Sequence, residues 1–130
     1  MFEINKEDLT IHITRGDAAV FSVGAMVREG EDKVSYTFRD GDVVRFSVCA
    51  KKDYSNVVLQ KDFTATEGME EVEIQLDSED TKIGDAISKA TEYWYEVELN
   101  PDTKPQTIIG HTEDGAKVFM LYPESVKEGV

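Results

Sequence analysis

Short segments in which apolar and polar residues alternate recur along this chain, and they constrain its fold more than any other feature. The clearest is "EEVEIQL", in which Val72, Ile74 and Leu76 alternate with acidic or amide side chains. A period of two residues places the two sets on opposite faces of a β-strand. The segment "EYWYEVEL" repeats the pattern, with Tyr95 and Val97 in the apolar set. The sequence therefore predicts half-buried strands.

Glycine, aspartate and proline separate these segments, because such residues favour turns. An Asp40-Gly41 turn is expected before the strand around Phe46, and the charged stretch "REGEDKVS" is interpreted as a loop. Further strands are expected at "NVVLQKDF", "QTIIGH" and "AKVFMLYP", with turns at "NPDTKP" and "TEDG". About eight short strands result.

The period changes only once, in "DSEDTKIGDAISKA". Ile83 and Ile87 lie four residues apart, and Ser78 or Asp77 is a suitable cap for a first helical turn. Gly84 argues against a long helix. We therefore expect a short helical or 3₁₀ crossover here.

These patterns together indicate an all-β fold. The chain has 130 residues, enough for one domain with its own core. The expected architecture is an immunoglobulin-like antiparallel β-sandwich of about seven to nine strands with one short helical crossover, and a closed barrel is the alternative. We expect one domain over residues 1–123 and a polar C-terminal tail over residues 124–130.

The tripeptide Arg15-Gly16-Asp17 matches a motif that adhesive proteins present to integrins. Alternating apolar residues before and after it indicate two strands, so the tripeptide lies where a turn is needed. Glycine tolerates positive φ, and aspartate hydrogen-bonds nearby backbone groups. We therefore interpret the tripeptide as a turn.

The charge balance limits the classes of partner. There are 14 Lys and Arg residues against 27 Asp and Glu residues, which gives a net charge of -13. Such a chain repels phosphate backbones and anionic membrane surfaces, so neither nucleic acid nor a membrane is expected as a partner. The start, "MFEINKEDLT", lacks the basic and apolar regions of a secretion signal, and none is expected.

Residues that often carry chemistry are present, but not in catalytic or metal-binding patterns. His12 and His111 have no second ligand at metal spacing, and Cys49 has no adjacent base. The acidic clusters at 67–73 and 77–85 lack the alternating-oxygen pattern of a calcium loop and are interpreted as solvated surface. We therefore expect a protein that is not an enzyme and has no catalytic residue, metal or cofactor.

Trp94, Glu96 and Glu98 form a candidate contact surface. If Tyr93 and Tyr95 face inward, these three side chains share the outward face of their strand. An exposed tryptophan beside acids suits sugar stacking or a protein contact, whereas a covered one only packs. The covered arrangement is the favoured one, because large aromatic side chains are mostly buried.

The order of several motifs resembles the N-terminal domain of phage baseplate upper proteins and their short prophage-encoded relatives. The motifs are "ITRGDAAVFSV", "GDVVRFSV", "DFTATEGMEEVEIQL", "YWYEVEL" and the closing "TIIG" and "KVFMLYPE", which together span nearly the whole chain. The resemblance implies an immunoglobulin-like sandwich that helps to build the tail tip and links receptor-binding parts to the tail.

Two functional classes follow. The first is a structural or assembly protein of a phage or prophage tail or baseplate, assembled in the bacterial cytoplasm and located in the virion tail. Its partners would be other tail or baseplate proteins, with weak homo-oligomers of its own. The second is a carbohydrate-binding or adhesive β-sandwich at a cell or virion surface.

Overall fold

The computed structural model describes residues 1–85 and 88–124, and this part of the chain is all-β. It contains eleven strands and no helix. This part of the chain therefore has no helix that is long and apolar enough to cross a membrane. The strands are β1 (Phe2–Ile4), β2 (Ile11–Thr14), β3 (Ala19–Val23), β4 (Met26–Glu29), β5 (Asp32–Ser35), β6 (Val43–Cys49), β7 (Val57–Thr64), β8 (Val72–Leu76), β9 (Thr91–Leu99), β10 (Gln106–Ile109) and β11 (Lys117–Tyr122).

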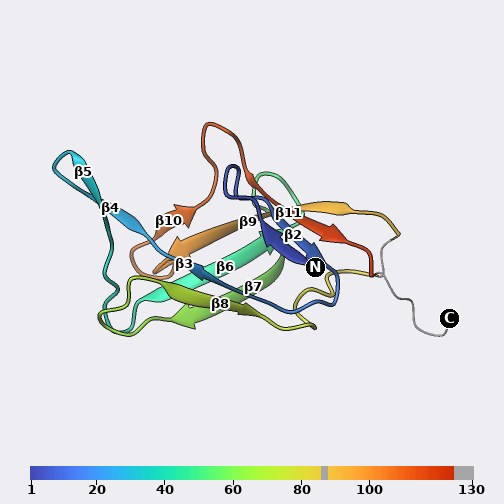
Figure 1. Cartoon of the computed structure of the whole chain (residues 1–130), viewed down its shortest axis with the longest axis horizontal. Helices are drawn as coiled ribbons and strands as arrows, with labels where there is room; N and C mark the ends of the chain where they lie inside the picture. The colour runs from blue at the N-terminus through green and yellow to red at the C-terminus, as the bar shows by residue number, and fades with distance from the viewer. Residues whose placement is uncertain (86–87, 125–130) are drawn as a thin grey trace.

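Seven strands form the main sheet, and six of them follow the order β1-β2-β11-β9-β6-β7 (Figure 1). β10 is the seventh strand and pairs with the last part of β9, beyond the residues that pair with β11. β11 runs parallel to β2 and antiparallel to β9, so the sheet is mixed rather than purely antiparallel as expected. The parallel pair brings the two ends of the described chain side by side.

One face of the main sheet packs against a second sheet made of β3 and β8. Phe21 of β3 meets Phe46 of β6 edge to face, with ring centroids 5.8 Å apart. The alternation seen in the sequence is realised here, since Val72, Ile74 and Leu76 are all buried. The buried apolar residues of both sheets form one cluster, so the core lies between the two layers.

The expected helical crossover is absent from the described residues, and eleven strands replace the expected seven to nine. Residues 77–85 form successive turns: the Asp80 N–H donates to the Asp77 carbonyl, and the Asp80 carboxylate accepts from the Asp77 N–H at 2.7 Å. Gly84 has φ +65°, outside helical geometry. The prediction relied on the spacing of Ile83 and Ile87, and residues 86–87 lie outside the described part, as do residues 125–130 of the expected polar tail.

The segment "REGEDKVS", expected to be a loop, instead contributes most of a hairpin. β4 and β5 pair from Met26↔Ser35 to Glu29↔Asp32 around Gly30, which has φ +63°. The hairpin projects from the body at one end of the molecule (Figure 1). The prediction was wrong because charged residues are common on a hairpin that is exposed on both faces.

Candidate binding groove

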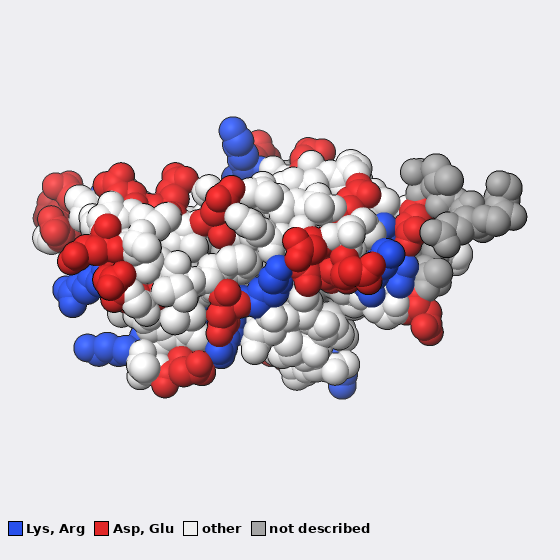
Figure 2. All heavy atoms as spheres, turned by 90° about the horizontal axis from the view of Figure 1, so that it is seen from below, with Lys and Arg blue, Asp and Glu red and all other residues white. Residues whose placement is uncertain are grey.

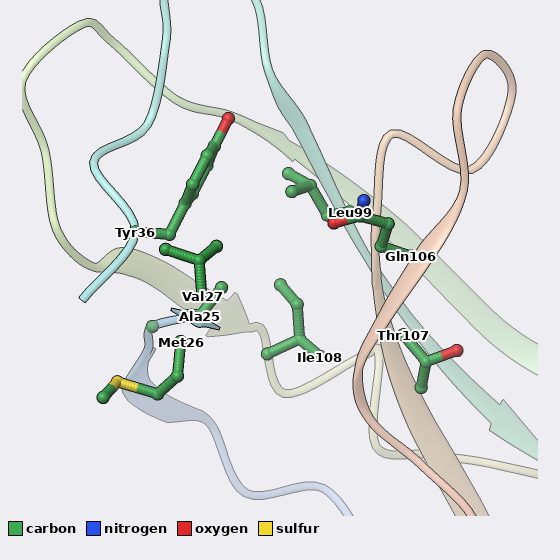
Figure 3. A pocket seen from close by; sticks show the side chains of 9 residues that line it. Ala25, Met26, Val27, Tyr36, Leu99, Gln106, Thr107 and Ile108 are labelled. Atoms are coloured by element: carbon green, nitrogen blue, oxygen red, sulfur yellow. The ribbon is translucent and has the colours of Figure 1, made fainter. Parts of the chain in front are cut away.

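A small groove separates the base of the β4–β5 hairpin from β10 (Figure 3). Its volume is about 190 Å³. Most of its lining side chains are apolar, and the polar ones come from β10. The lining residues are Gly24, Ala25, Met26, Val27, Tyr36, Leu99, Gln106, Thr107 and Ile108.

Two strand edges border this groove. β4 pairs with β5 and β10 pairs with β9, while in the described part of the chain no backbone hydrogen bond joins β4 to β10. A strand edge carries backbone N–H and C=O groups that are available to another strand. The groove therefore combines apolar side chains with unpaired backbone.

The Tyr36 wall of the groove is held in place by a buried carboxylate. Asp42 is 9% exposed and accepts hydrogen bonds from the Tyr36 hydroxyl at 2.7 Å, the Arg39 N–H at 2.9 Å and the Asn100 side-chain amide at 3.0 Å. Burial alone would raise the pKa of Asp42, but the three donors outweigh it and hold the pKa below its ordinary value. The bond to Asp42 in turn raises the pKa of Tyr36.

Asn100 connects the same carboxylate to the strands behind the groove. The side-chain oxygen of Asn100 accepts a hydrogen bond from the Val43 N–H at 2.9 Å. The backbone N–H of Asn100 donates to the Val43 carbonyl at 2.7 Å. Asn100 has φ +48°, a conformation that asparagine tolerates better than most residues. The turn that leads from β9 toward β10 is thereby fixed to the start of β6.

The β10 wall has an irregular shape. Its pairing with β9 shifts register between Thr107 and Ile109, so Ile108 is an extra residue on that strand. Gly110 follows Ile109, the last residue of β10, and a Cβ atom there would lie 2.6 Å from the Thr107 Cγ2. Glycine at this position lets the chain turn closely around Thr107.

Sequence reasoning placed strands near several of these residues but did not identify the groove. "QTIIGH" was predicted as a strand, whereas nothing in the sequence indicates that β10 lies opposite residues 24–27. The Tyr36 to Asp42 bond spans six residues and the Asn100 to Asp42 bond spans 58. The second of these contacts, and the approach of β10 to residues 24–27, are long-range and leave no local signal.

Trp94, Glu96 and Glu98 lie on the outward face of β9, away from the core. Trp94 is half-buried, with Cys49 of β6 and Val118 of β11 as its cross-strand neighbours. Burial, and then repulsion by Glu98, raise the pKa of Glu96. The three side chains share a face, but they lie outside the lining of the groove.

Arg15, Gly16 and Asp17 form the turn between β2 and β3. The Asp17 N–H donates to the Thr14 carbonyl at 3.0 Å, and Gly16 has φ +88°. The Arg15 guanidinium, whose side chain is 13% exposed, donates to the Gly84 carbonyl and to the Glu124 carboxylate, each at 2.8 Å. Asp17 pairs with the N-terminal ammonium group. The arginine that an integrin would recognise is therefore engaged within the chain, whereas the Asp17 carboxylate remains at the surface.

The remaining candidates are dispersed. His12 shares a 2.8 Å hydrogen bond with the Tyr122 hydroxyl, and His111 is exposed. Cys49 is buried, which raises the pKa of its thiol and disfavours the reactive thiolate. Among residues 1–85 and 88–124, no group of three His, Cys, Asp or Glu side chains is arranged to hold a metal ion.

No protein-family model, curated protein or solved structure matches this chain. The groove, the strand edges and the surface charge are therefore the features that bear on its function.

Proposed function

We propose that this chain is a structural or assembly protein of a phage or prophage tail or baseplate that acts through protein–protein contacts. The observation that carries the proposal is the pair of strand edges, β4 and β10, that border one groove without pairing to each other. Natural proteins usually protect such edges, and a protein that assembles with others can use them. The resemblance of the motif order to baseplate upper proteins suggests the setting.

An immunoglobulin-like sandwich is part of this proposal. Its support is the packing of the β3–β8 pair on one face of the main sheet, with Phe21 against Phe46 as one contact between the layers. The proposed location is the virion tail after assembly in the bacterial cytoplasm, and no catalytic step, cofactor, nucleic acid or membrane enters the proposed role.

The carbohydrate-binding or adhesive alternative draws less support from the side chains. A stacking platform needs an open aromatic face, but Trp94 is half-buried between its two neighbouring strands. An adhesive motif needs a presented arginine and aspartate, but the Arg15 side chain is largely buried and bonded within the chain. Assembly through the groove is therefore the better-supported role.

Mass spectrometry of tail particles purified from an induced lysogen tests the assembly role. We expect the chain at a fixed ratio to the known tail proteins, together with weak self-association in light scattering that strengthens with salt as the charge of -13 is screened. Absence from the particles, combined with glycan binding that Trp94→Ala abolishes, would instead establish the carbohydrate-binding role.

A further inference from the structure

We propose that the groove binds an extended, basic segment of a partner protein, which adds to β10 as a further strand and inserts an apolar side chain beside Met26. This inference rests on the proposed assembly role and specifies the chemistry of the partner. It follows from three features: the free backbone edge of the groove, its size and the acidic net charge of the chain.

The backbone edge determines the conformation of the segment. β10 pairs with β9 along one edge only, and the described residues place no strand against its other edge. A segment that adds there must be extended, because only an extended chain presents N–H and C=O groups at matching spacing. Recognition by strand addition takes most of its affinity from the main chain and its specificity from pockets for alternate side chains.

The groove volume limits the inserted side chain. A cavity of roughly 150 Å³ is known to accept a benzene ring, so about 190 Å³ has room for one aromatic or branched aliphatic side chain. Tyr36 forms a fixed wall because its hydroxyl is bonded to Asp42. Met26 forms an adaptable one, since it is 59% exposed and its thioether chain is flexible.

The net charge of the chain favours a basic occupant over a second copy of this chain. Glu98 lies opposite Thr107 of β10, while the hairpin carries mixed charge, with Arg28 opposite Lys33 and Glu29 opposite Asp32 near its tip. On the face that Figure 2 shows, Asp and Glu side chains are spread over the surface, with fewer Lys and Arg side chains among them. Two copies would each bring a net charge of -13 to the contact, whereas lysine or arginine on the segment would be attracted.

A short synthetic peptide, KVTVKVTVK, tests this inference with the full chain, using fluorescence anisotropy to follow binding. The peptide has valine at every second position and lysine at both ends. We expect saturable binding that weakens as salt is added, together with slowed hydrogen exchange at the β10 amides. The control peptide carries N-methyl groups on alternate backbone nitrogens, which removes donors from one edge, and it should not bind.

A matched pair of variants locates the site. Met26→Ser should weaken peptide binding about tenfold, because it removes apolar contact from the groove. Val20→Ser removes a side chain of similar exposure, 56% against 59%, from β3 and should leave binding unchanged. Because both side chains are largely exposed, both variants should fold.

Three results would overturn the inference: no binding up to about 1 mM, equal binding of the N-methylated peptide, or equal binding by Met26→Ser. A wild-type dimer that Met26→Ser dissociates would overturn it too, by making a second copy the occupant. Failure of the peptide would leave the tail-particle result intact, and absence from tail particles would leave peptide binding intact.

Discussion

Replacing Asp42 by asparagine should destabilise the fold strongly although it barely changes the shape of the side chain. One carboxylate oxygen accepts from the Tyr36 hydroxyl and the Arg39 N–H, and the other accepts from the Asn100 amide. An asparagine offers one acceptor oxygen, and its NH₂ group cannot accept a bond from a backbone N–H. At least one buried donor therefore loses its partner, and the remaining bonds lose their charge.

The magnitude follows from the value of such bonds. A hydrogen bond to a charged group contributes about 1.5–3 kcal/mol, and an unsatisfied buried donor costs about 1–3 kcal/mol. We expect Asp42→Asn to lower the free energy of unfolding by about 2–3 kcal/mol. For a chain of this length each kcal/mol corresponds to roughly 3–5 °C in melting temperature. Tyr36→Phe removes one of the bonds and should cost about 1–2 kcal/mol.

Urea unfolding followed by the fluorescence of Trp94, the single tryptophan, measures the change. The midpoint should fall while the slope stays constant, since the surface exposed on unfolding does not change. Asp40→Asn is the matched control, because it makes the same change of charge at an exposed side chain two residues earlier. It should shift the midpoint little.

The effect of pH gives a second test with a defined sign. Because the pKa of Asp42 is lowered in the folded protein, its contribution is complete above the unfolded value of about 3.9 and is lost as pH falls through the folded value. The stability difference between wild type and Asp42→Asn should therefore be constant from pH 7 to about pH 5 and shrink below about pH 4. An unchanged midpoint at pH 7 would refute the hydrogen-bond network as described.

Three further substitutions test other features. Glu96→Gln should raise the melting temperature, because it removes a carboxylate whose pKa is raised by burial and by a like charge; a lower temperature would contradict this. Gly110→Ala should cost about 1–3 kcal/mol in a urea titration, because its Cβ would lie 2.6 Å from the Thr107 Cγ2, and Thr107→Ser in the same chain should restore part of the loss. Arg15→Ala should lower the free energy of unfolding by about 1 kcal/mol, because it removes the hydrogen bonds to the Gly84 carbonyl and the Glu124 carboxylate. Arg28→Ala, at an exposed side chain, should change it little. Equal effects of the two arginine variants would argue against those contacts.

The strands that the sequence predicts best are those with one buried face. In β8 the alternation of Val72, Ile74 and Leu76 with polar residues directly reflects burial between two layers. β9 is similar, with Tyr95 and Val97 buried. These strands are predictable because a single physical cause, the exclusion of one face from water, sets both the residue types and their period.

Elements without a buried face were harder to predict. The β4–β5 hairpin pairs Arg28 with Lys33 and Glu29 with Asp32, so its composition resembles that of a loop. The crossover was wrong for a different reason: the segment forms successive turns, and Gly84, with φ +65°, leaves helical geometry, which the spacing of apolar residues does not register. The groove was not predictable at all, because its walls are brought together only by tertiary contacts.

The edges of β7 and β8 differ from the edge of β10 that borders the groove. β7 and β8 lie at neighbouring edges of the two layers, and there Lys61 of β7 donates to the Gln75 carbonyl at 2.9 Å and to the Asp80 carboxylate at 2.8 Å. A lysine that occupies an edge carbonyl and carries a charge to that edge discourages another strand from pairing there. No side chain in the described part of the chain bonds to the backbone of β10 in this way. Lys61 thus protects one pair of edges, whereas β10, like the outer strand β1, has a partner strand on one side only in the described part of the chain. A strand edge of this kind beside the groove is what the proposed strand addition requires.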